Sequence, residues 1–188
     1  VKEAKGAGFS ESKKGKYIKE LHDSLIADNQ VNANVRYGTR DIEIVAFAFL
    51  DENNRPRHTL VSGEPAKAVF LFDAAENSIH DAVAVIAVYR PDGVCSMQLL
   101  SNRDNPNLGT ITKQGVFEVN IPRLYLGAGD YIASIALFRG LDLSSKIEPE
   151  AYDLHDRCYP LKVLQPDGIK VELGTVNQPS SWRVLLND

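Results

Sequence analysis

Residues 82–100, AVAVIAVYRPDGVCSMQLL, show most directly what kind of fold the chain adopts. Two apolar runs, residues 82–90 and 94–100, flank the turn sequence RPDG at 90–93. Pro presets the first backbone torsion of such a turn, and Gly accepts a positive one. Because the runs are short and rich in β-branched residues, the pattern predicts two strands joined by a turn.

The same pattern repeats over residues 40–164. Five further runs rich in Val, Ile, Phe and Tyr lie at 42–50, 66–74, 115–121, 130–138 and 158–164. Seven short strands with turn signals and little helical spacing between them indicate an all-β chain, an antiparallel immunoglobulin-like β-sandwich. The sixth run begins Gly-Asp-Tyr, which places Tyr131 near a corner like the tyrosine corner of such folds.

The first 37 residues follow a different period. Apolar side chains recur at helical spacing in this segment, at Tyr17, Ile18, Leu21, Leu25 and Ile26. We interpret residues 1–37 as a linker with a short amphipathic helix that ends near Asn29. Because the chain begins with Val and not Met, we expect a fragment of a longer protein whose upstream domain precedes this linker.

Composition narrows the function classes. A chain of 188 residues suffices for one domain whose core needs no disulfide or metal. The 21 Lys and Arg and 25 Asp and Glu form no long block of one sign, so we expect no nucleic-acid partner. Cys95 and Cys158 are read as free thiols in a reducing compartment. No apolar run reaches the roughly 18 residues of a membrane span, and no secretory leader is recognisable.

The segment YDLHDRCYPLKV, residues 152–163, places His155 three residues before Cys158. The pair could be a nucleophile with its base, half of a metal site, or the polar entrance to a buried strand. We favour the strand entrance, since a zinc site wants four ligands and the remaining histidines are scattered. The sequence also lacks the phosphate loop and other common catalytic motifs, so we predict no catalytic residue, metal or cofactor.

Several motifs occur in an order that resembles a known family. They are GTRDIEIVAFAFLDENNRP, SGEPAKAVFLF, the RPDG turn, NIPRLYLGAGDYIASIALF and YDLHDRCYPLKV, spread over residues 38–164. This order resembles the C-terminal domain of Wzt, the nucleotide-binding subunit of the ABC transporters that export O-antigen polysaccharide.

The resemblance implies a non-catalytic, jelly-roll-like carbohydrate-binding module. Such a module recognises the capped non-reducing end of the polysaccharide and couples chain completion to export. It implies an upstream ATPase domain, a membrane-spanning partner subunit, and a cytoplasmic location at the inner face of the inner membrane. It also implies a homodimer that exchanges C-terminal strands. A structural immunoglobulin-like module for protein interaction remains an alternative.

Residues 165–188 form an extension beyond the seventh run. After the turn QPDG, the segments 169–173 (IKVEL) and 180–186 (SSWRVLL) are two further candidate strands. A half-buried strand needs a sheet edge and an apolar surface. Either the chain's own sandwich or a second subunit supplies them.

A ligand site is expected on the outer face of the sheet that holds the third, fourth, sixth and seventh strands. A sugar-binding site needs an apolar or aromatic surface together with hydrogen-bonding groups. Alternation along these strands places small residues in the middle of a shallow groove. Its predicted members are Val85, Ala87, Tyr89, Ser96, Gln98, Ser134, Ala136, Phe138 and Lys162. A partner's tail or the linker helix could instead cover this face.

Two loops, residues 101–109 and 139–153, are expected to form the rim of this groove. Asn102, Arg103 and Arg139 are their candidate ligand contacts, although such residues also commonly form turns. The carboxylates Asp142, Glu148 and Glu150 in the second loop keep a glycoside hydrolase as a further alternative.

Overall fold

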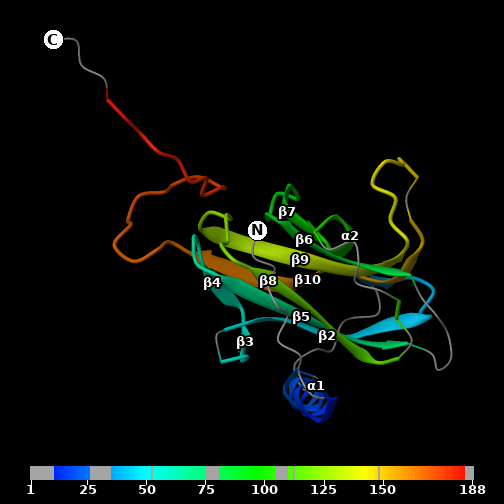
Figure 1. Cartoon of the computed structure of the whole chain (residues 1–188). Coiled ribbons are helices and arrows are strands. Elements are labelled where there is room, and N and C mark those ends of the chain that lie inside the picture. Colours follow the sequence, from blue (N-terminus) through cyan, green and yellow to red (C-terminus); the bar gives the residue numbers. More distant parts are fainter. Residues whose placement is uncertain are drawn as a thin grey trace, which may run out of the picture.

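The structure is a computed structural model that describes residues 11–25, 35–51, 53–74, 81–104, 110–111, 113–147 and 149–184, with side chains in the first range from Gly15 onward. Two β-sheets pack face to face, and helix α1 (Glu11–Leu25) lies against the outer face of one of them (Figure 1). This arrangement confirms the predicted antiparallel β-sandwich with a short N-terminal helix.

Each sheet combines consecutive strands, such as β6 and β7, with strands that are distant in sequence. Sheet A has the order β1 (Arg36–Tyr37), β10 (Ala151–Leu164), β9 (Gly129–Arg139), β6 (Ala82–Tyr89) and β7 (Cys95–Leu100). The short strand β4 (Thr59–Val61) adds to β10 in parallel. Sheet B has the order β3 (Pro56–Arg57), β2 (Ile42–Leu50), β5 (Ala66–Ala74) and β8 (Gly115–Ile121). A short helix, α2 (Ser101–Asp104), follows β7.

All seven predicted runs form strands, and the third, fourth, sixth and seventh share sheet A as expected. The start of the last strand was predicted wrongly, because β10 begins at Ala151 and not at residue 158. His155 and its neighbours therefore lie within a strand and not at its entrance. A bulge in the middle of β10 interrupts the alternation that a sequence reading relies on.

The core lies between the two sheets. Inward-facing side chains of sheet A, such as Ile86 and Ile135, pack against Phe47 and Phe70 of sheet B. The Phe47 and Phe70 rings meet edge to face, with centroids 5.2 Å apart. Each large apolar side chain buried in this way contributes about 1.5 to 3 kcal/mol of transfer free energy.

The predicted tyrosine corner is present. Tyr131 is buried, and its hydroxyl donates a hydrogen bond of 2.9 Å to the carbonyl oxygen of Gly127, four residues earlier. This bond fixes the segment that leads into β9.

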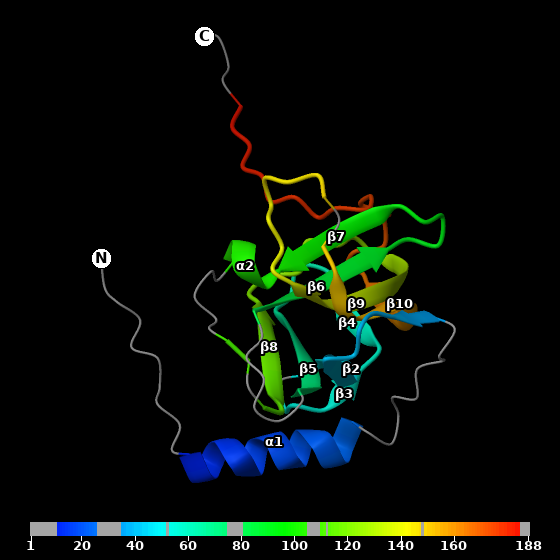
Figure 2. The same ribbon diagram turned by 90° about the vertical axis from the view of Figure 1, so that its right-hand side faces the viewer.

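Helix α1 covers the outer face of sheet B (Figure 2). Leu21 and Leu25 are 3% and 1% exposed and pack on residues of β2 and β5. At the β8 edge, the Tyr17 hydroxyl donates a hydrogen bond to the Glu118 carboxylate. The Lys67 ammonium group lies 2.9 Å from the Tyr17 hydroxyl and 2.8 Å from the Glu118 carboxylate. The predicted end of the helix near Asn29 lies outside the described residues.

The C-terminal extension runs along the segment before β9 and then leaves the sandwich (Figure 1). Gly127 donates its N–H to the carbonyl of Thr175 at 2.9 Å, and Leu126 and Val176 form an antiparallel bridge. Within this single chain, residues 169–173 and 180–184 form no strand. Trp182 is 93% exposed.

Candidate functional site

Three strands of sheet A bring predicted site residues into one row on its outer face. Ala87 of β6 pairs with Gln98 of β7 on one side and with Ser134 of β9 on the other. Directly paired residues of antiparallel strands point to the same face. Gln98 is exposed, whereas Ala87 and Ser134 are 5% exposed and form the floor of the row.

The row ends at the bulge of β10. Asp156, Arg157 and Cys158 stand opposite the single residue Ser134, because His155 pairs with Ile135 and Tyr159 with Ala133. The Ser134 hydroxyl donates to Oδ1 of Asp156 at 2.9 Å and accepts the backbone N–H of Arg157 at 2.8 Å. Arg157 has φ +46°, which is uncommon for a residue with a side chain.

The bulge directs Arg157 over Tyr89. The guanidinium carbon lies 5.1 Å from the centre of the Tyr89 ring, a distance suited to a cation–π contact. Burial raises the pKa of Tyr89, as does the nearby Asp156 carboxylate. The side chains of Arg157 and Asp156 stay 54% and 39% exposed. We call Tyr89, Gln98, Ser134, Asp156 and Arg157 the polar platform.

The other half of the predicted groove is closed. Val85 and Ala136 are 4% and 2% exposed, because Phe138, Leu141 and Leu154 pack against them. Phe138 is therefore part of a small apolar cluster and not an open stacking surface. The loop after β9 ends the accessible part of the face.

The remaining predicted site residues lie apart from the platform. Ser96 lines the space between the sheets, since a bulge in β7 makes Cys95 the partner of Tyr89. Lys162 pairs with Asp130 at 3.6 Å. The rim candidates Arg139 and Arg103 form ion pairs with neighbouring carboxylates, at 3.2 Å to Asp41 and 2.6 Å to Asp104.

Asn102, the third rim candidate, ties α2 to the loop after β9. Its side-chain nitrogen donates to the carbonyl of Leu141 at 2.6 Å, while its side-chain oxygen is buried without a partner among the described residues. The predicted rim loop continues through residues 105–109, which lie outside the described residues.

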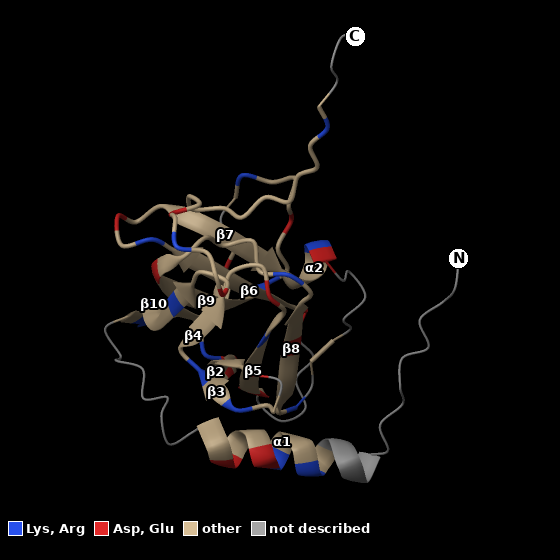
Figure 3. Ribbon diagram, turned by 90° about the vertical axis from the view of Figure 1, so that its left-hand side faces the viewer, with Lys and Arg blue, Asp and Glu red and all other residues tan. Residues whose placement is uncertain are grey.

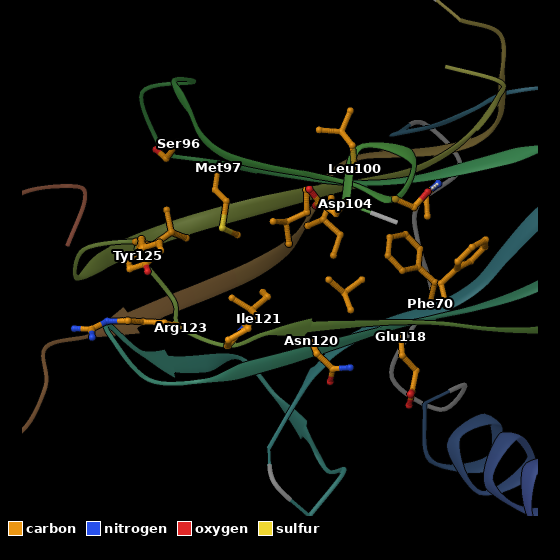
Figure 4. A pocket seen from close by; sticks show the side chains of 18 of the residues that line it. Phe70, Ser96, Met97, Leu100, Asp104, Glu118, Asn120, Ile121, Arg123 and Tyr125 are labelled. Atoms are coloured by element: carbon orange, nitrogen blue, oxygen red, sulfur yellow. Dashed lines mark hydrogen bonds between the residues drawn. The ribbon is translucent and has the colours of Figure 1, made fainter. Parts of the chain in front are cut away.

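A second hollow lies between the sheets, where β7 and β8 face each other as edge strands (Figure 4). This edge cleft has a volume of about 660 Å³. Its interior is mainly apolar, with Phe70, Ile86, Met97, Leu99, Phe117 and Ile121 among the lining residues. The side chains of Glu118 and Asn120 point away from it, toward the outer face of sheet B (Figure 4). The cleft therefore suits an apolar guest better than a sugar.

His155 belongs to a buried polar cluster that fastens the linker strand β1. Asp153, fully buried, receives bonds from Arg36 at 2.6 and 3.0 Å and from the N–H of Ile44 at 2.7 Å. His155 lies 3.4 Å from Asp153 and 2.7 Å from the Tyr159 hydroxyl. These contacts account for His155 as a structural residue.

Cys158 is not arranged as a nucleophile. Burial raises the pKa of its thiol to about 11, and the nearby Asp156 carboxylate acts in the same direction. The thiol is therefore protonated at neutral pH, whereas a nucleophilic cysteine needs its thiolate form. Within the described residues, no three His, Cys, Asp or Glu side chains gather in a way that could hold a metal ion.

The carboxylates considered for glycoside hydrolysis serve the loop after β9. Asp142 accepts bonds from Ser144, which lower its pKa, and Glu150 pairs with Arg139 at 3.4 Å. Glu148 lies outside the described residues. Both described carboxylates thus make local contacts, whereas hydrolysis requires two acids that face each other across a cleft.

Lys and Arg are interspersed with Asp and Glu over the described residues, and neither sign gathers in one region (Figure 3). Neither of the helices in this part of the chain has the length and apolar character needed to cross a membrane.

Asp156 and Arg157 were not among the site residues predicted from the sequence. Alternation cannot assign a face to residues in a bulge, because the extra residues shift the period. The run of polar residues His155, Asp156 and Arg157 inside an otherwise alternating strand was the available signal.

Comparison with known proteins identifies relatives of the whole sandwich. A sequence model of the Wzt C-terminal domain family matches residues 33–178. A crystal structure of the C-terminal domain of wzt superposes with a TM-score of 0.70 at 15% identity, covering 89% of this chain and 99% of that one. No curated protein matches the chain.

Proposed function

The chain belongs to the Wzt C-terminal domain family, and on that premise we propose that it is the non-catalytic carbohydrate-binding domain of an ABC transporter's ATP-binding subunit. It binds the capped non-reducing end of an O-antigen polysaccharide and couples chain completion to export. An upstream ATPase domain joins it to the membrane-spanning subunit. The domain thus works in the cytoplasm, at the inner face of the inner membrane.

The polar platform is the observation that supports carbohydrate binding. An aromatic ring, an exposed amide, a carboxylate and a guanidinium surround a floor of small side chains, Ala87 and Ser134. Sugar hydroxyls both donate and accept hydrogen bonds, so they need partners of both kinds. The cluster around Phe138 closes one end of this surface, which suits a chain end better than the middle of a chain.

Calorimetric titration with delipidated O-polysaccharide from the source strain tests the proposal. Gln98→Ala should weaken binding and leave the melting temperature unchanged, because Gln98 is exposed. Asn120→Ala removes an exposed amide from sheet B and is the matched control. Polysaccharide from an unrelated serotype should bind less. Equal failure of both polysaccharides would leave the protein-interaction alternative, and release of reducing sugar on long incubation would favour a hydrolase.

The edge cleft supports a homodimer that exchanges residues 165–188. Among the described residues, β7 and β8 each pair with one strand only, so their free edges expose unpaired backbone groups beside an apolar interior. The extension carries exposed apolar side chains, with Val171 67%, Trp182 93% and Val184 77% exposed. The extension of a second subunit, added as a strand, would pair with the free backbone groups of β7 or β8, and its apolar side chains would fill the cleft.

Light scattering after size exclusion tests the exchange. A chain ending at Gln178 keeps the contacts of Thr175 and Val176 with its own sandwich and loses the extended part. It should have the mass of a monomer, as should Val119→Glu in the cleft wall. Val94→Glu at the exposed hairpin is the control. An unchanged dimeric mass of the shortened chain would show that residues 179–188 are not the dimerising element, and the same mass for a chain ending at Gln165 would rule out the whole extension.

A further inference from the structure

The bulge of β10 holds two oppositely charged side chains in a strained but well-supported conformation. Arg157 has φ +46°, a region that residues with a Cβ seldom occupy. Strained residues of this kind persist where the surrounding structure holds them, and they concentrate at binding sites. Here the Ser134 hydroxyl holds both the Arg157 N–H and the Asp156 carboxylate.

The charged groups of this pair keep free hydrogen-bonding positions. Nε of Arg157 lies 3.5 Å from Oδ1 of Asp156. In the part of the chain that the structure describes, Oδ2 of Asp156 and the terminal guanidinium nitrogens of Arg157 make no hydrogen bond. The Tyr89 ring lies 5.1 Å from the guanidinium carbon and limits the motion of that group. The free N–H groups of Arg157 therefore lie beside the free carboxylate oxygen of Asp156, and both side chains are accessible to solvent.

The chemistry of this pair matches two neighbouring hydroxyl groups. A carboxylate accepts a hydrogen bond from one hydroxyl, while the guanidinium donates to the oxygen of the next. Both bonds are charge-assisted and hence stronger than bonds between neutral groups. An isolated anion would meet the Asp156 carboxylate, so the pair favours a neutral ligand.

We propose that Asp156 and Arg157 form a clamp for a vicinal diol of a neutral sugar ring, which names the substrate class of the carbohydrate site and rests on the proposed function. Ser134 is a positioning residue that holds the clamp in shape. Gln98, across Ala87, is placed to bind a further hydroxyl of the same chain.

Periodate oxidation separates the clamp from the general proposal, because periodate cleaves vicinal diols. Delipidated O-polysaccharide from the source strain, native or oxidised and then reduced with borohydride, is titrated into the protein. Binding of the native form and its loss after oxidation is the expected result. Equal binding of both forms overturns the diol clamp alone. Failure of the native form to bind overturns the proposed function and the clamp with it.

Two variants test the named residues. Asp156→Asn keeps an acceptor for Ser134 but replaces Oδ2 by a donor, so affinity should fall about 10- to 100-fold. Asp73→Asn, on the exposed side of β5, makes the same change away from the site and should bind normally. Arg157→Gly removes the guanidinium and relieves the positive φ. It should therefore lose binding while its melting temperature stays equal or rises, and unchanged affinity in either site variant would refute the clamp.

Discussion

Asp153 offers a sharp test of how the linker is fastened to the sandwich. Burial alone would raise its pKa, but the close contact with His155 and the hydrogen bonds from Arg36 and the N–H of Ile44 outweigh burial and hold the pKa at about 2. Against an ordinary value of 3.8, this corresponds to about 2 to 3 kcal/mol of stability. Since the folded pKa is lowered, this contribution is complete above the unfolded pKa and is lost as the pH falls from about 4 to 2.

Asp153→Asn should destabilise the protein by about 3 kcal/mol at neutral pH, because Arg36 is left without its buried counter-charge. Urea unfolding of both proteins between neutral pH and pH 2 measures the effect. The two stability curves should converge as the wild-type carboxylate becomes protonated. Asp130→Asn, which removes an exposed carboxylate paired with Lys162, is the control and should change little. A loss below about 1 kcal/mol, with the wild-type acid slope retained, would refute this account of the cluster.

Gly38→Ala should cost at least about 2 kcal/mol, since a Cβ would lie 2.4 Å from a carbonyl oxygen of β10 and φ is +125°. A Cβ at Gly15 in α1 would meet open space, so Gly15→Ala should stabilise the helix by about 0.5 to 1 kcal/mol. Equal melting temperatures of the Gly38→Ala and Gly15→Ala variants would contradict the close approach of Gly38 to β10. Leu25→Ala should weaken the docking of α1 by about 2 to 3 kcal/mol, seen as faster amide exchange in the helix alone; unchanged exchange would argue against docking. Iodoacetamide at neutral pH should modify exposed Cys95 and spare Cys158, and the reverse order would contradict the raised pKa. Chelators should leave the melting temperature unchanged, and a metal found at one equivalent would overturn this prediction.

Most of the fold could be predicted from the sequence because the strands are apolar runs with clear boundaries. The runs at 42–50, 66–74 and 115–121 coincide with β2, β5 and β8, since turn residues bound each of them. The assignment of four strands to one sheet followed from the immunoglobulin-like order. Alternation then separated inner from outer residues correctly wherever the pairing is regular, as at Ala87 and Ser134.

The errors occurred where the pairing is irregular. The bulges in β7 and β10 shift the period, so Ser96 faces the space between the sheets and Arg157 joins the outer face. The polar residues His155, Asp156 and Arg157 resembled a strand entrance because the main partner of the neighbouring buried Asp153, Arg36, is more than a hundred positions away. Tertiary contacts of this kind leave no local pattern.

The candidate site could be predicted only in part, for a related reason. Tyr89, Gln98 and Ser134 were placed on one face by alternation, and the structure brings them together around Ala87. Phe138 was expected to be an open aromatic surface. The loop after β9 folds back and Leu141 packs against it, which depends on loop conformation and not on strand period.

Amide chemical-shift mapping with a short fragment of the O-polysaccharide tests carbohydrate binding at the polar platform most directly. We expect the perturbed amides to cluster at Ala87, Gln98, Ser134 and Arg157, on the outer face of sheet A. Perturbations confined to Phe117 and its neighbours in the edge cleft, or no perturbation at saturating fragment, would contradict it.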